Sequence, residues 1–321
     1  MPRRIAAGFF AAAAPDLDFV LAFVSPLVYL EQHRGVTHSV LLLPLWALLL
    51  SWILAKILRE PRGWRALYGI TALGLGAHIL GDLITSFGTI IFAPVSDARF
   101  GWGTTFIIDL WFTGIILAGL IASLAWRRTR IPAAAASLVL VAYVGFQAVL
   151  KERALDYARD YARQQGWSGV ELSVMPRAVS PFNWTVYASD AVAHRFAHVN
   201  LWREEPLPAA HDFIGRLDAA FQPLAQAHWQ TRTRYGASAE EQALAQSAWD
   251  SPALGFMRWF AEMPAFDGLS VGSTCVWFVD LRFLNPGRDW VPFRYGACQD
   301  RPGEPWRAFE RLDGAARQAV D

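Results

Sequence analysis

Four long apolar segments in the first half of the chain place the strongest constraint on its fold. Each approaches the roughly 20 apolar residues that a helix needs to cross a bilayer. They are residues 40–58, 66–84, 107–126 and 131–150. A fifth apolar stretch, residues 5–30, is interrupted by Pro15, Asp16, Asp18 and Pro26, which is typical of a broken or re-entrant helix. We therefore expect an all-α transmembrane bundle of about four to five helices.

The distribution of charge divides the chain near residue 150. Residues 1–150 contain 11 of the 29 Lys and Arg residues and 7 of the 28 Asp and Glu residues. Residues 151–321 hold the remaining charges and combine helical patterns with strand-like runs in separate stretches, which favours an α+β fold. We predict a membrane-embedded helical metal-site domain over residues 1–150 and a soluble α+β domain over residues 151–321. The net charge of +1, with no basic stripe, argues against nucleic-acid binding.

Several patterned segments define the predicted soluble domain. Its helical patterns cover residues 151–165 and 239–263. Its strand-like runs are residues 170–174, 184–189, 194–202, 271–283 and 290–297. The domain also holds both cysteines, Cys275 and Cys298. A disulfide is expected if the domain is exported, and two reduced, buried thiols are the alternative.

Basic residues in short connecting segments predict the orientation of the bundle. Nine of the eleven basic residues of the first half fall on one side if the first apolar stretch crosses once. They are Arg3, Arg4, Lys56, Arg59, Arg62, Arg65, Arg127, Arg128 and Arg130. Such residues mark the cytoplasmic side. We therefore expect a multi-pass protein of the bacterial inner (plasma) membrane whose C-terminal domain is periplasmic.

Ionisable residues lie in or beside these apolar segments. They are Asp16, Asp18, His33, His38, His78, Asp82 and Asp109. An Asp at the centre of a membrane helix costs about 2.5–3.5 kcal/mol, so such residues usually pair, face a cavity or bind ions. In the predicted topology, separate chain segments bring them towards one membrane face. That convergence predicts a polar cluster.

The spacing of these residues refines the prediction. His78 and Asp82 are four residues apart and share one face of a helix. His33 and His38 flank a predicted turn in which Gly35 permits unusual backbone angles. Asp16 and Asp18 occupy alternate positions and would point the same way from an extended or kinked backbone. Purely structural alternatives remain open: a packing pair on the helix, helix caps at the carboxylates, and interfacial histidines.

The quoted residues also resemble a known family. The elements are Pro15-Asp16-Leu17-Asp18, His33-Arg34-Gly35-Val36-Thr37-His38-Ser39, His78-x-x-x-Asp82 and Phe106-Ile107-Ile108-Asp109. Over roughly residues 8–130 they look like the YdjM-like family of inner-membrane proteins, regarded as metal-dependent hydrolases. The resemblance implies a helical metal site and phosphoester cleavage, by analogy with zinc-dependent phospholipases C. The chain lacks the Asp-x-x-Thr-His element with which family members usually begin.

The first hypothesis is a membrane-bound metal-dependent hydrolase. The predicted metal ligands are Asp18, His33, His38, His78 and Asp82. Imidazole with carboxylate suits Zn²⁺, with Mn²⁺ or Fe²⁺ as alternatives, and an open coordination position would hold a water of lowered pKa. Asp16 or Asp109 is predicted to be a ligand, general base or orienting residue, and Arg34 to bind the anionic group of a lipid or phosphoester substrate.

Two other classes of function fit the same residues. The His and Asp cluster could form the relay of an ion- or proton-coupled transporter, although no inverted repeat is visible. The first half could also be a non-catalytic membrane anchor for the second. The histidines of the second half are predicted to be structural. His194 and His198 are four residues apart but lie in a strand-like run and lack the HExxH pattern, and His211 and His228 have no partners at metal-site spacing.

Overall fold

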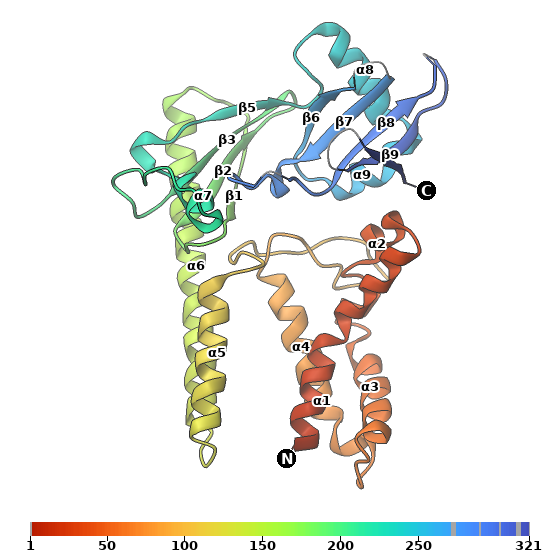
Figure 1. Ribbon diagram of the computed structural model, residues 1–321, viewed down its shortest axis with the longest axis vertical. Coiled ribbons are helices and arrows are strands. Elements are labelled where there is room, and N and C mark those ends of the chain that lie inside the picture. The colour runs from red at the N-terminus through yellow and green to blue at the C-terminus, as the bar shows by residue number, and fades with distance from the viewer. Residues whose placement is uncertain (1, 271–273, 289, 302, 313–315, 321) are drawn as a thin grey trace. The chain divides into compact units, whose positions relative to one another are not determined.

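The computed structural model describes residues 2–270, 274–288, 290–301, 303–312 and 316–320 (Figure 1). The chain forms two compact units that meet in sequence between Gly103 and Thr104. The boundary predicted at residue 150 instead falls inside one helix, α6 (Ile131–Gln164). This helix continues because residues 146–164 contain neither Pro nor Gly, so the apolar segment passes directly into a charged helical one.

The first unit is helical throughout its regular structure. Its elements are α1 (Pro2–Ala13), η1 (Pro15–Phe23), α2 (Pro26–Gln32), η2 (Val36–His38), α3 (Leu43–Ile57), η3 (Trp64–Ala66) and α4 (Tyr68–Leu83). Pro15 and Pro26 each open a new helical segment, as their fixed φ and missing N–H favour. The predicted interruption of the first apolar stretch is therefore confirmed, with a bend of 47° between α1 and η1.

Helices α1, α3 and α4 pack around a small apolar core that includes Ala7, Leu54 and Leu67. The contact of α1 with α4 is close at Gly74, where an added Cβ would lie 2.7 Å from the carbonyl oxygen of Gly8. Large apolar side chains such as Leu73 remain exposed on the outside of these helices. An apolar exterior of this kind suits a lipid environment.

The second unit begins with a helical hairpin. Helix α5 (Leu110–Ala125) runs beside the first half of α6 (Figure 1). Asp109 caps α5 by accepting the N–H of Phe112, and its other carboxylate oxygen accepts the hydroxyl of Tyr143, at 2.8 Å, and the amide of Gln147. The capping alternative for Asp109 is thus confirmed.

Two five-stranded sheets complete the second unit, confirming the predicted α+β fold of the C-terminal part. One has the order β1-β2-β3-β4, with β5 also paired to β3, and the other the order β10-β9-β8-β7-β6. The strands are β1 (Glu171–Pro176), β2 (Asn183–Ser189), β3 (Ala193–Asn200), β4 (Gln222–Pro223), β5 (Gln230–Thr233), β6 (Pro264–Leu269), β7 (Thr274–Asp280), β8 (Arg294–Gln299), β9 (Arg307–Arg311) and β10 (Arg317–Ala319). The second half of α6 packs on the first sheet through Leu150, Ala154 and Ala158, which meet Trp184 and Val186.

Three short helices accompany the sheets: α7 (Phe213–Ala219), α8 (Ala239–Asp250) and α9 (Gly255–Phe260). The single helix predicted over residues 239–263 is wrong, because Ser251 is extended before Pro252 and separates α8 from α9. Short 3₁₀ turns lie at Leu224–Gln226, Pro252–Leu254 and Leu281–Phe283.

The number of membrane-spanning helices is smaller than predicted. Among the described residues, α6 is the one helix long and apolar enough to cross a membrane. Counting the two bent pairs, α1 with η1 and residues 26–38 with α3, as one span each raises the number to three. Helices α4 and α5 have 16 residues each, which is short for a full crossing. A bundle of four to five spanning helices is therefore not confirmed.

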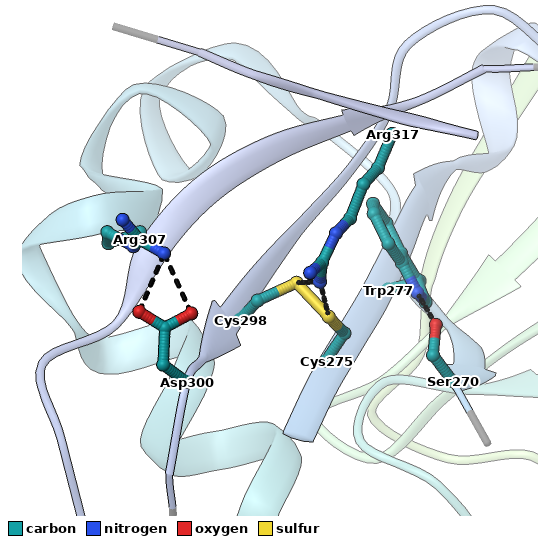
Figure 2. Close-up of a disulfide and its surroundings, with 7 residues drawn as sticks. All are labelled: Ser270, Cys275, Trp277, Cys298, Asp300, Arg307 and Arg317. Carbon is teal, nitrogen blue, oxygen red and sulfur yellow. Dashed lines mark hydrogen bonds and ion pairs between the residues drawn. A yellow bond between two sulfur atoms is a disulfide. The ribbon is translucent and has the colours of Figure 1, made fainter. Parts of the chain in front are cut away.

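Cys275 and Cys298 form a disulfide in the second sheet (Figure 2). They face each other directly across β7 and β8. The guanidinium of Arg317 on β10 lies 2.6 Å and 3.0 Å from the two sulfur atoms, and the indole of Trp277 donates to Ser270 nearby. The structure therefore favours the disulfide over two free thiols.

Candidate metal centre

Four side chains of the first unit converge on a single point. Asp16 comes from η1, His38 from η2, and His78 and Asp82 from α4. One nitrogen or oxygen atom of each lies within 4.8 Å of the corresponding atoms of the others. The predicted common face of His78 and Asp82 is confirmed, because their side-chain atoms approach to 3.5 Å across one helical turn.

The distances between these donor atoms match those around one ion. His38 Nε2 lies 3.1 Å from both His78 Nε2 and Asp82 Oδ2. Asp16 Oδ1 lies 3.3 Å from His78 Nε2 and 3.6 Å from His38 Nε2. Donors bound to one tetrahedral zinc ion at 2.0–2.1 Å are separated by about 3.3 Å. The four side chains are therefore placed as ligands of one divalent metal ion could be.

Thr37 and Asp18 set the tautomer that the neutral His38 ring adopts. The Thr37 hydroxyl donates to Asp18 Oδ2 at 3.1 Å and lies 2.9 Å from His38 Nδ1. Since the hydroxyl has one hydrogen, it accepts the N–H at His38 Nδ1. The neutral imidazole then presents an unprotonated Nε2 to the cluster, which is the form that binds metal.

One carboxylate oxygen of the cluster has no hydrogen bond. Asp82 Oδ2 is buried and accepts no hydrogen bond from the described residues. The other oxygen of this carboxylate pairs with the guanidinium of Arg34 at 3.0 Å. The nearest printed neighbours of Asp82 Oδ2 are the Nε2 atoms of His38 and His78, at 3.1 Å and 3.5 Å. An ion bound among the four donors would satisfy this buried oxygen.

Arg34 is held beside the cluster. It is 5 % exposed, and its guanidinium donates to Thr85 as well as pairing with Asp82. Arg34 therefore orients one of the four candidate donors, Asp82. The substrate-binding role predicted for it stays a prediction.

Backbone geometry explains how the segment from His33 to His38 folds. Arg34 has a φ of 59°, a conformation rare for residues other than Gly, Asn and Asp. Its backbone N–H is held by Asp18 Oδ2 at 3.1 Å. Gly35 is needed for space, since a Cβ there would lie 2.8 Å from the carbonyl oxygen of Gln32. The predicted turn is present, and Gly35 has the expected unusual backbone angles, with φ −97° and ψ −114°. Arg34 is the left-handed residue of this segment.

Asp16 and Asp18 point to different partners, contrary to the prediction that they point one way. They lie in a 3₁₀ helix, where each residue turns by about 120° and residues two apart diverge. Asp16 joins the donor cluster, whereas Asp18 Oδ1 binds His33 Nδ1 at 2.9 Å. Asp18 and His33 thus lie outside the four-donor group, and their predicted roles as metal ligands stay predictions.

Burial shows how the cluster is reached. The His38 side chain is fully buried, and those of His78 and Asp82 are 14 % and 12 % exposed. The Asp16 side chain is 59 % exposed. Access to the centre is therefore on the Asp16 side, where a water or substrate can approach an ion.

The remaining predicted residue, Asp109, belongs to the second unit. Its carboxylate is engaged by the α5 cap and by Tyr143 and Gln147. The catalytic role predicted for it stays a prediction. Sequence reasoning missed the orienting contacts of Thr37 and Thr85. The position of Thr37 next to His38 was the signal that could have indicated its role.

Two buried histidines of the first sheet have structural contacts. His194 bonds Ser189 and the carbonyl of Pro264, and His198 bonds Thr185. Burial lowers the pKa of His194 and lowers that of His198 to about 3. Both are neutral at physiological pH, and neither belongs to a metal-binding group among the described residues.

The N-terminal part of the chain matches a known sequence family. Residues 2–154 match the sequence family described as "YdjM inner membrane protein". This stretch is therefore similar to the YdjM family. The match confirms the suspected resemblance and supports a membrane location.

One curated relative of the chain is "Uncharacterized protein YfhP" of Bacillus subtilis (strain 168). It is 26% identical over 136 residues, which cover 42% of this chain and 40% of the relative. The chain thus matches about two fifths of that protein's length. No solved structure matches the chain. All four donor residues lie within residues 2–154, which match the family, whereas the two sheets lie outside them.

Proposed function

We propose that the protein is a membrane-bound, metal-dependent hydrolase. Its metal, which we take to be zinc, is bound by Asp16, His38, His78 and Asp82. The observation that supports this assignment is the convergence of the four donors within 4.8 Å of one another, with five of their separations at 3.1–3.6 Å. Manganese and iron are alternatives with the same kinds of ligand.

The bound ion would supply a water of lowered pKa as the nucleophile. The chain's own residues prepare the site for it. Thr37 and Asp18 hold His38 in the metal-binding tautomer, and Arg34 orients Asp82. Asp16 lies at the exposed edge, where it borders the approach of the substrate.

The proposed substrate is a phosphoester, either a membrane lipid or a lipid-linked molecule. Two features support this choice. A hydrolytic zinc site stabilises the charge that develops on a phosphoryl oxygen. The helices that carry the donors also have exposed apolar side chains, including Leu73 and Leu80 on α4, which suit contact with lipid. We place the site at the periplasmic face, as the distribution of basic residues predicts.

Metal analysis of the purified full-length protein tests the proposal. We expect about one equivalent of zinc in the wild type and a loss of most of it in His78→Ala and Asp82→Asn. His211→Ala is the matched control, because His211 is exposed and lies in the second unit. Equal, substoichiometric metal in all four proteins would overturn the metal assignment.

Hydrolysis is tested separately. Full-length protein in phospholipid nanodiscs is incubated with a chromogenic phosphodiester and with phosphatidylglycerol, with and without a chelator. We expect release of the phosphoester products by the wild type, loss on chelation and recovery with zinc. A protein that holds stoichiometric metal but hydrolyses neither compound would contradict hydrolysis of this class. Uptake of ions into proteoliposomes without product formation would instead support the transporter.

A further inference from the structure

A second candidate site lies entirely within the second unit. A cavity of about 320 Å³ is enclosed by three chain segments and the short helix α7. Its lining consists of Phe106, Ile108, Leu110, Ala178, Val179, Phe213, Ile214, Leu217, Phe221, Asn285, Pro286 and Arg288. This volume is at the lower end of the range for small-molecule sites, and such sites are mostly apolar with few polar groups.

The walls of the cavity are held by specific contacts. Asp212 caps α7 by accepting the N–H of Gly215. The loop over residues 285–288 packs tightly on α7, since a Cβ at Gly287 would lie 2.8 Å from the carbonyl oxygen of Arg216. Asn285 is in turn fixed by the guanidinium of Arg177 at 2.9 Å. The cavity is therefore part of the folded unit.

The cavity lies at the charged end of the apolar α5–α6 hairpin. Residues 110–125 and 131–150 contain no charged residue, and the hairpin is flanked by Asp109 and Lys151 at one end. Asp109 is bonded to Tyr143 and Gln147, so this end of both helices lies at the same level. Leu110, the first residue of α5, lines the cavity together with Ile108. The lining is thus continuous with the lipid-facing surface of the hairpin.

The exposed lining residues indicate which class of ligand the cavity could bind. Ile108, Leu110, Phe213 and Ile214 are each more than half exposed. A cluster of large exposed apolar side chains marks an interaction site. Arg288 is the one charged residue among the described lining residues, and a positive charge beside an apolar site suits a lipid phosphate. Val179, which is β-branched, also adopts a φ of 76° here, a strain that tends to be found at ligand sites.

We propose that this cavity binds an acyl chain of an anionic membrane phospholipid, with Arg288 near the phosphate. The lipid enters from the leaflet that surrounds the end of α5. The site is separate from the four-donor cluster and does not depend on the hydrolase assignment.

Photocrosslinking of full-length protein in nanodiscs tests the proposal. The probe is phosphatidylglycerol with a diazirine near the end of one acyl chain, and the adducts are mapped by mass spectrometry of peptides. We expect adducts on residues 213–221 and 285–288 in addition to those on the membrane helices. Adducts confined to α5 and α6 would overturn the proposal.

Two variants with matched controls sharpen the test. Ile214→Glu places a carboxylate in the lining and should lower the cavity adducts at least about tenfold. Val192→Glu, at an exposed apolar position that does not line the cavity, should leave them unchanged. Arg288→Gln should reduce labelling by the phosphatidylglycerol probe more than by a phosphatidylcholine probe with the same chain, whereas Arg232→Gln should not. Equal losses in Ile214→Glu and Val192→Glu would contradict binding of the acyl chain in the cavity. An unchanged lipid preference in Arg288→Gln would contradict recognition of the anionic headgroup by Arg288.

Discussion

At the scale of the residue, the candidate centre separates the groups that would bind metal from those that position them. His38 shows this best, because its Nε2 faces the donor cluster while its Nδ1 is held by Thr37. Asp18 holds Thr37 and also the backbone of Arg34. Contacts of this kind fix the tautomer and the direction of a ligand, and losing one typically weakens metal binding about 10–100-fold.

Thr37→Val tests this positioning role. Valine keeps the shape of threonine but removes both hydrogen bonds of the hydroxyl, so His38 loses the acceptor that keeps its proton on Nδ1. We expect zinc affinity to fall about 10–100-fold, measured by competition with a chelating dye on the full-length protein. Thr37→Ser should restore most of the affinity, and Thr113→Val, on the exposed side of α5, should not change it. Wild-type affinity in Thr37→Val would show that the hydroxyl does not position the ligand.

At the scale of the element, sequence patterns predicted which segments carry the site but not how they bend. The spacing of His78 and Asp82 was sufficient because an α-helix fixes side chains four residues apart. The spacing of Asp16 and Asp18 was not, since the 3₁₀ geometry of η1 sends the two carboxylates to different partners. Their roles depend on contacts with His33 and His78, which are distant in sequence and leave no local signal.

Helix packing in the first unit depends on a close approach that one substitution can test. Gly74→Leu would place side-chain atoms against the backbone of Gly8, where even a Cβ has only 2.7 Å of space. Overpacking of this kind costs about 1–3 kcal/mol. We expect a lower midpoint of thermal unfolding in detergent for Gly74→Leu, together with weaker zinc binding because α4 carries two of the donors.

Gly69→Leu is the control for this prediction. It changes the same residue type in the same helix, at a position where no atom lies within 4 Å of an added Cβ. Its thermal midpoint should stay near that of the wild type. Equal midpoints for both variants would mean that the α1–α4 contact adjusts without cost.

At the scale of the whole molecule, the sequence predicted a helical part followed by an α+β part, but placed the boundary differently. The charge-poor part of the sequence ends near residue 150, yet the structure divides into units after Gly103. The reason is that α6 belongs both to the α5–α6 hairpin and, through its second half, to the packing on the first sheet. Composition indicates whether a segment lies in an apolar or an aqueous environment, whereas a structural unit is defined by the contacts among its residues. Long-range contacts such as those of Leu150 with Trp184 are not visible in composition.

Membrane orientation is the expectation at this scale that a direct measurement can decide. If the nine basic residues of the connecting segments lie in the cytoplasm, the second unit is periplasmic, and the disulfide of Cys275 with Cys298 forms in an oxidising compartment. We expect alkaline phosphatase fused after Val320 to be active and the same fusion after Arg130 to be inactive in a bacterial host, since Arg130 lies in the basic connection before α6. A thiol-reactive polymer should shift the mobility of the full-length protein only after reduction, and a Cys275→Ser, Cys298→Ser variant should not shift at all. The opposite fusion pattern, with free thiols in the unreduced protein, would place both sheets in the cytoplasm.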